Sequence, residues 1–197
     1  IEELGAGLRA WFYEEAAGRR WRISARSFFQ NRPAGVDALV EVVDAMVADL
    51  APKRGISDLM VDAYAGIGIF AGTVGRNRKV TAVERSKDSL ADAKVNLQDQ
   101  MKAGTAQVIP SPVERWRPTP ASVVVADPAR VGLGRDGTRT LLGCKPDLFV
   151  LVGCDHSAFA RDSALLVAGG MKLVRLVLVD LFPDTSHVET LGAFVRA

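Results

Sequence analysis

The strongest constraint on the fold is the regular alternation of short apolar runs with longer stretches of helical periodicity. In residues 33–50 valine and leucine recur at helical spacing, and an Ala-Pro sequence follows and ends the stretch. Apolar runs typical of buried strands occur at residues 59–64, 79–83, 107–109, 123–126, 148–152, 173–179 and 191–195. Further helices are expected at residues 69–76, 138–144 and 157–168, and between Ser86 and Gly104. Strands that alternate with helices predict a mostly parallel sheet with helices on both faces.

Composition indicates one globular domain. The chain has 197 residues, of which 48% are hydrophobic and 24% charged, and this is enough for a full core. It contains no apolar run of about 18 residues and no charged-then-apolar start, so we expect a soluble, cytoplasmic protein. Cys144 and Cys154 form no CxxC pattern, which argues against a metal site or a disulfide framework, and we expect Cys144 to be a buried apolar side chain. Because the chain starts at Ile1, we expect a fragment of a longer protein.

The net charge of +2 does not by itself indicate a nucleic-acid partner. The first segment nevertheless gathers arginines around aromatic rings: Arg19, Arg20, Arg22, Arg26 and Arg32 surround Trp21, Phe28 and Phe29. Cations interleaved with stacking rings are typical of sites for single-stranded RNA. A solvated basic face explains the same pattern equally well.

A turn containing two glycines joins the strand at residues 59–64 to the next helix. Gly66 and Gly68 lie in this turn, and Glu84 follows the next strand. Glycine lets the backbone approach a ligand closely, and a carboxylate at the tip of the second strand can accept both hydroxyls of a ribose. The turn also fits the looser dinucleotide fingerprint, so an oxidoreductase that uses NAD or NADP stays open, as does a tight turn without a ligand.

Three polar residues of the second half follow or begin strands of the expected sheet. Asp127 comes after the strand at residues 123–126, Cys154 comes after the strand at 148–152, and Glu189 precedes the last strand. If the last strand is antiparallel and inserts beside the fifth, Cys154 and Glu189 flank one small pocket, because adjacent strands lie about 4.8 Å apart. A thiol and a base beside a cofactor are what methylation of a pyrimidine at carbon 5 requires, since this carbon is not nucleophilic until a thiol has added to carbon 6.

Five segments resemble, in order, the RNA 5-methyluridine methyltransferases, which use S-adenosylmethionine to methylate tRNA or 23S rRNA. These segments are Phe28-Phe29-Gln30, residues 62–70, Asp127-Pro128-Ala129-Arg130, Gly153-Cys154 with Ala160-Arg161-Asp162, and residues 180–190. The resemblance runs from about Trp21 to the end of the chain. It implies an α/β class I methyltransferase fold, in which a Rossmann-like seven-stranded sheet has an antiparallel last strand and helices on both faces.

The resemblance also implies roles for individual residues. Cys154 would be the nucleophile, and Glu189 would be the base that removes the carbon 5 proton. The residues expected to bind S-adenosylmethionine are Gln30, Asp62, Tyr64, Gly66, Gly68, Glu84 and Asp127. Residues 1–32 would end a preceding RNA-binding region packed on a catalytic domain of residues 33–197. We expect a monomer that acts on tRNA or 23S rRNA and needs neither a metal nor a membrane.

Several positions depart from the family pattern. Gly153-Cys154-Asp155-His156 stands where Ser-Cys-Asn-Pro is usual, Pro112-Val113 stands where an acidic residue precedes alanine, and Ala65 and Ile69 replace a cysteine and a polar residue. A carboxylate at Asp155 should disfavour the thiolate of Cys154 unless Arg161 or His156 offsets it. The alternatives are therefore a methyltransferase-fold protein with another acceptor or weak activity, and an NAD(P)-dependent oxidoreductase.

Overall fold

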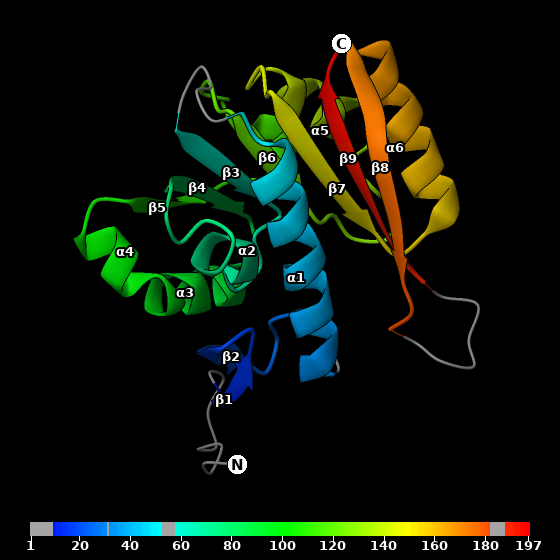
Figure 1. Cartoon of the computed structure of the whole chain (residues 1–197). Helices are drawn as coiled ribbons and strands as arrows, with labels where there is room; N and C mark the ends of the chain where they lie inside the picture. The colour runs from blue at the N-terminus through cyan, green and yellow to red at the C-terminus, as the bar shows by residue number, and fades with distance from the viewer. Residues whose placement is uncertain (1–9, 31, 53–57, 182–187) are drawn as a thin grey trace.

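The computed structural model describes residues 10–30, 32–52, 58–181 and 188–197. Within these ranges the chain forms a seven-stranded sheet and a separate two-stranded hairpin (Figure 1). The strands of the large sheet are β3 (Leu59–Ala63), β4 (Lys79–Glu84), β5 (Ala106–Pro110), β6 (Val123–Ala126), β7 (Leu148–Gly153), β8 (Met171–Val179) and β9 (Glu189–Arg196). Their order across the sheet is β5-β4-β3-β6-β7-β9-β8.

The sheet confirms the predicted fold class. Strands β5, β4, β3, β6 and β7 pair in parallel, and β9 inserts between β7 and β8 antiparallel to both. Parallel strands end at one edge of the sheet, and the antiparallel β9 begins at that same edge. The first residue of β9 and the residue after β7 therefore reach one place, as the strand pattern predicts.

The helices follow the predicted positions with three differences in length. They are α1 (Pro33–Leu50), α2 (Ile69–Gly72), α3 (Lys87–Asn96), α4 (Gln98–Lys102), α5 (Gly134–Leu142) and α6 (His156–Ala168), with a 3-10 turn η1 (Val113–Arg115). The helix expected from Ser86 to Gly104 is interrupted at Leu97, whose φ of −104° and ψ of 10° leave the helical region. Helix α2 ends four residues early.

Helix α5 starts before its predicted first residue for a reason that lies elsewhere in the chain. The buried carboxylate of Asp162 on α6 accepts hydrogen bonds from the backbone N–H groups of Leu133 and Gly134, at 2.6 and 3.1 Å. This contact satisfies N–H groups that have no partner within the helix. A tertiary hydrogen bond therefore starts the helix in a glycine-containing stretch where local propensity is poor.

Two apolar cores cover the two faces of the sheet. Side chains of α1, α2 and the hairpin pack with Met60, Val125 and Val150 on one face. Side chains of α5 and α6 pack with Val61, Val124 and other alternate strand residues on the opposite face. Figure 1 shows α1 lying across one face, with α5 and α6 on the other. Of the helices in the described part of the chain, none has the length and apolar character needed to cross a membrane.

The sequence did not predict the hairpin of β1 (Trp11–Ala16) and β2 (Arg19–Ser24). Trp21 has no exposed surface, and its indole Nε1 donates to the carbonyl of Ala16 at 2.8 Å. The guanidinium of Arg19 lies 4.7 Å from the centre of the Trp21 ring. The interpretation of Trp21 as a ring available to stack on RNA bases is therefore wrong, because tertiary packing buries it in the core shared with α1.

Candidate functional site

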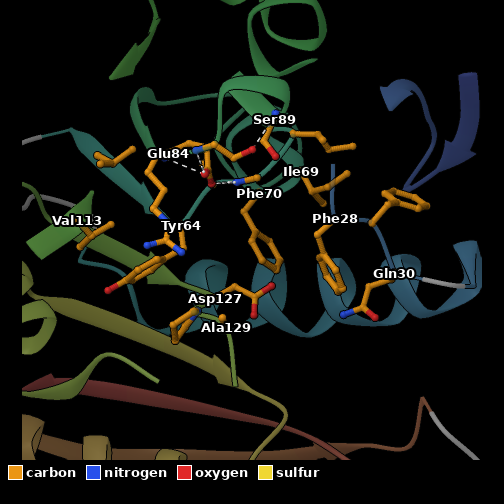
Figure 2. Close-up of a pocket in the computed structure, with 18 of the residues that line it drawn as sticks. Phe28, Gln30, Tyr64, Ile69, Phe70, Glu84, Ser89, Val113, Asp127 and Ala129 are labelled. Atoms are coloured by element: carbon orange, nitrogen blue, oxygen red, sulfur yellow. Dashed lines mark hydrogen bonds between the residues drawn. The ribbon is translucent and has the colours of Figure 1, made fainter. Parts of the chain in front are cut away.

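A cavity of about 670 Å³ opens at the edge of the sheet where the parallel strands end. This volume lies within the range of about 300 to 1,000 Å³ that is typical of small-molecule sites. The walls come from segments far apart in the sequence: Arg26 and residues 28–30, residues 64–67 and 84–86, Ser111 with residues 113–114, and residues 127–132, together with Cys154 and Glu189. Figure 2 shows Glu84 and Ser89 on one side of the cavity, Asp127 and Gln30 on the other, and the rings of Phe70 and Phe28 between them.

The turn after β3 forms one wall. Tyr64 and Gly66 line the cavity, and both have positive φ, 60° and 54°, which holds the turn in a tight left-handed conformation. Gly68 also has a positive φ, but a Cβ there would lie 3.0 Å from the Leu97 side chain, so Gly68 faces the protein rather than the cavity.

Asp62 lies beneath this turn. Its Oδ2 accepts a hydrogen bond from the backbone N–H of Ala71 at 2.8 Å, and its Oδ1 is buried without a hydrogen bond. Burial raises the pKa of Asp62 to about 7. Of the four residues predicted in this turn, the structure therefore places Tyr64 and Gly66 in the cavity wall and Asp62 and Gly68 behind it.

Glu84 ends β4 and faces the turn. Its Oε2 accepts from the backbone N–H of Gly66 at 2.9 Å, and its Oε1 accepts from those of Arg85 and Ser86 at 2.7 and 2.6 Å. These three donors fix the carboxylate at the cavity wall. An ionised carboxylate has about four acceptor positions, so it can still accept a ligand hydroxyl.

The opposite wall brings Cys154, Glu189 and Asp127 together. Gly153 of β7 pairs with Thr190 of β9, and this register puts the neighbouring Cys154 and Glu189 at one end of the strand pair. Both line the same cavity as Asp127 and Gln30. The pairing agrees with the sequence expectation for these two residues. Residues 182–187 of the last resembling segment, including His187, lie outside the described residues.

Burial shifts the acid–base behaviour of these groups. It raises the pKa of Glu189, while a hydrogen bond from Gln30 acts in the opposite direction. Burial, and then the Glu189 charge, raises the pKa of Asp127 to about 7. The pKa of the Cys154 thiol is raised by burial, by the charge of Glu189 and, to a smaller extent, by Asp127. The positive charge of Arg130 acts in the opposite direction and lowers this pKa. Cys144 is fully buried in the core, as predicted.

The predicted effect of Asp155 on the thiol is wrong. Asp155 caps α6, and its Oδ1 accepts from the backbone N–H of Ala158 at 2.8 Å. Arg161 pairs with Asp162 at 2.9 Å instead of facing Cys154. The charges that act on Cys154 are thus Glu189, Asp127 and Arg130, because the helix cap turns Asp155 back onto its own backbone.

Sequence reasoning missed Glu114. The Tyr64 hydroxyl donates to its Oε1 at 2.8 Å, and both residues line the cavity. Glu114 directly follows Pro112-Val113, the position where the family pattern has an acidic residue, so a shift of the alignment could have found it. Among the residues that the structure describes, no three or more His, Cys, Asp or Glu side chains form a group that could hold a metal ion.

Comparison with known proteins shows what the chain is similar to. No protein-family model matches it. It is 33% identical over 202 residues to an uncharacterized RNA methyltransferase of Streptomyces avermitilis, an alignment that covers 96% of this chain and 45% of that protein. The structure of Pyrococcus abyssi tRNA (uracil-54, C5)-methyltransferase in complex with S-adenosyl-L-homocysteine superposes with a TM-score of 0.78 and 25% identity, over 94% of this chain and 44% of that one.

A third match shows the fold alone. The structure of the M. jannaschii tRNA m1G37 methyltransferase superposes with a TM-score of 0.71 at 15% identity, over 99% of this chain and 59% of that one. The fold and the cavity together define a class I S-adenosylmethionine-dependent methyltransferase fold. Two sequence relatives, 33% and 37% identical to this chain, carry the name of uncharacterized RNA methyltransferases. The chain spans under half the length of the curated relatives that it matches, with 45% and 42% of two of them covered.

Proposed function

We propose that this chain is the catalytic domain of an S-adenosylmethionine-dependent RNA methyltransferase that acts on carbon 5 of a uridine. The observation that carries the proposal is the meeting of Cys154 and Glu189, from β7 and β9, in the cavity that the glycine turn and Glu84 also line. The similarity to a tRNA uracil C5 methyltransferase crystallised with S-adenosylhomocysteine supports it. The RNA methyltransferases among the sequence relatives support RNA as the substrate.

The residues present fit the cofactor. Glu84 is the acceptor for a ribose hydroxyl, and the open space above Gly66, where a Cβ would meet nothing within 4 Å, leaves room for a close approach to the backbone. The Tyr64 and Glu114 pair lines the same cavity and offers polar atoms for the adenine edge. When bound, S-adenosylmethionine supplies an electrophilic methyl group.

The protein groups then supply the reactivity that uracil lacks. Cys154 adds to carbon 6 as the thiolate, after its proton has been lost, and the addition moves the carbon 5–carbon 6 electron pair toward the carbonyl and makes carbon 5 nucleophilic. After carbon 5 is methylated, Glu189 removes its proton, and the returning electron pair expels the Cys154 sulfur. The raised pKa of Glu189 makes it a stronger proton acceptor than an exposed glutamate.

The rim of the cavity suits an extruded RNA nucleotide. Phe28 is 72% exposed beside the opening, and the exposed Arg26 and Arg130 line it. An exposed ring can stack on a base, and guanidinium groups bind phosphate. The reacting base must leave its stack to enter this cavity.

The covalent step gives the decisive experiment. Full-length protein is incubated with S-adenosylmethionine and RNA that carries 5-fluorouridine. Carbon 5 then carries fluorine in place of the proton that Glu189 would remove. Elimination is therefore blocked, and the Cys154 adduct should persist through denaturing electrophoresis. Cys154→Ala should abolish the adduct, and the matched Cys144→Ala, which alters a buried core thiol, should leave it. If the Cys154→Ala variant still methylates RNA, the methyl group is transferred directly to an atom that is already nucleophilic, and the uridine proposal fails.

A further inference from the structure

Asp92 is a buried carboxylate that lies outside the cavity and binds the chain segment that covers the cavity. Asp92 lies on the inner face of α3 with none of its surface exposed. Its carboxylate accepts from the backbone N–H of Ser24 at 2.7 Å, from the Ser24 hydroxyl at 2.8 Å and from the Ser27 hydroxyl at 2.5 Å. It also forms an ion pair with Arg22 of β2. The Arg22 charge and these donors offset the cost of burying the carboxylate.

All of these donors belong to the hairpin and to the segment that leaves it. We call residues 24–30 the strap. Four strap residues, Arg26, Phe28, Phe29 and Gln30, line the cavity, and Gln30 bonds to Glu189. The strap past Ser24 contains no helix or strand. Its backbone bonds run from Ala25 N–H to the Ala10 carbonyl and from Ser27 N–H to the Ser24 carbonyl, both at 2.8 Å, and neither reaches the catalytic domain.

We propose that Asp92 is a positioning residue, which through Ser27 and Ser24 sets the strap over the cofactor and aligns Gln30 with Glu189. The inference rests on the proposed function for the identity of the ligand, and on the hydrogen bonds alone for the order of the strap. Asp92 does not line the cavity, so its influence on binding passes through the strap.

A second contact separates this role from simple anchoring of the hairpin. Asn96 lies one helical turn after Asp92, and its side chain bonds to both the N–H and the carbonyl of Arg22, at 2.8 and 3.0 Å. Its amide also donates to the Ile67 carbonyl of the glycine turn at 3.0 Å. The hairpin therefore stays attached through Asn96 when a strap contact to Asp92 is removed.

The test uses Ser27→Ala, which deletes one hydroxyl and leaves Asp92 its other partners, with Asp92→Asn as a stronger change. The matched control is Ser122→Ala, which removes a buried hydroxyl bonded to the Leu59 carbonyl, away from the strap. Calorimetry measures S-adenosylhomocysteine affinity, and hydrogen–deuterium exchange measures the order of residues 24–30 in the ligand-free protein. Melting temperatures are recorded for every variant.

Ser27→Ala should weaken S-adenosylhomocysteine about tenfold, the effect of one hydrogen bond to a charged group, and should speed exchange in the strap with little change in melting temperature. Ser27→Thr should restore both values, and Ser122→Ala should change neither. Wild-type affinity in Ser27→Ala and Asp92→Asn would overturn the inference while the proposed function stands. If the wild type binds no S-adenosylhomocysteine, the proposed function fails, and unchanged exchange in the strap would then overturn the positioning role as well.

Discussion

Replacing Glu84 with glutamine is the sharpest test of how the cavity recognises its ligand. The carboxylate holds three backbone donors, with Arg85 and Ser86 on Oε1 and Gly66 on Oε2. A glutamine has one carbonyl oxygen and one NH₂ group. If its oxygen keeps Arg85 and Ser86, its NH₂ group faces the N–H of Gly66, so one hydrogen bond is lost and two donors oppose each other.

The expected loss follows from this geometry. In Glu84→Gln the ribose hydroxyl loses the charged acceptor of its hydrogen bond, and the turn at Gly66 loses its anchor. Each hydrogen bond to a charged group contributes about 1.5–3 kcal/mol. We expect S-adenosylhomocysteine to bind Glu84→Gln about 10- to 150-fold more weakly than the wild type, since about 1.4 kcal/mol corresponds to a tenfold change.

Isothermal titration calorimetry measures this change directly. Glu41→Gln is a suitable control, because Glu41 is an exposed residue of α1 that does not line the cavity. Parallel titrations with NADPH test the oxidoreductase alternative. Equal affinity of the wild type and Glu84→Gln for S-adenosylhomocysteine would refute the assignment of Glu84 to the ribose. Binding of NADPH without any response to S-adenosylhomocysteine would refute the methyltransferase proposal.

Two further predictions concern stability. Trp21→Phe should destabilise the fold by about 1–3 kcal/mol, because the Ala16 carbonyl loses its buried indole donor, and urea unfolding that matches the wild type would contradict this. Folding raises the pKa of Asp127 from 3.8 to about 7, so the folded chain holds more protons than the unfolded chain between these values. Stability should therefore fall as the pH rises from about 4 to about 7. Thermal melts of Asp127→Asn should show a shallower fall with the same sign, because Asp62 contributes a similar shift. An unchanged pH dependence would exclude Asp127 as a source.

Much of the site could be read from strand ends. Glu84, Asp127 and Cys154 each follow a run of buried apolar residues, and parallel strands end at one edge of the sheet. Glu189 joined them because β9 is antiparallel and starts at that edge. The local turn chemistry of Gly66 was equally legible, since its positive φ is a property of a few neighbouring residues.

Other parts of the site depend on contacts that no local pattern records. Asp155 and Arg130 both lie near Cys154 in the fold, yet a helix cap removes Asp155 from the thiol and leaves Arg130 as the cation that acts on it. Glu114 lines the cavity and accepts a hydrogen bond from Tyr64, which lies 50 residues away in sequence. The partners of Arg130 and Glu114 in the site are therefore set by how the helices and strands pack, and not by the neighbouring residues in the sequence.

The sequence by itself determined the alternation of strands and helices, the glycine turn and the acidic and thiol groups at the strand ends, because periodicity and turn chemistry act over a few residues. The tertiary structure alone decided that Trp21 is a core residue and that Asp92 holds the strap over the cavity. Burial and long-range hydrogen bonds depend on which distant segments meet, and the same residues in an exposed hairpin would form a basic, aromatic surface. That difference in burial separates a structural tryptophan from an RNA-stacking one.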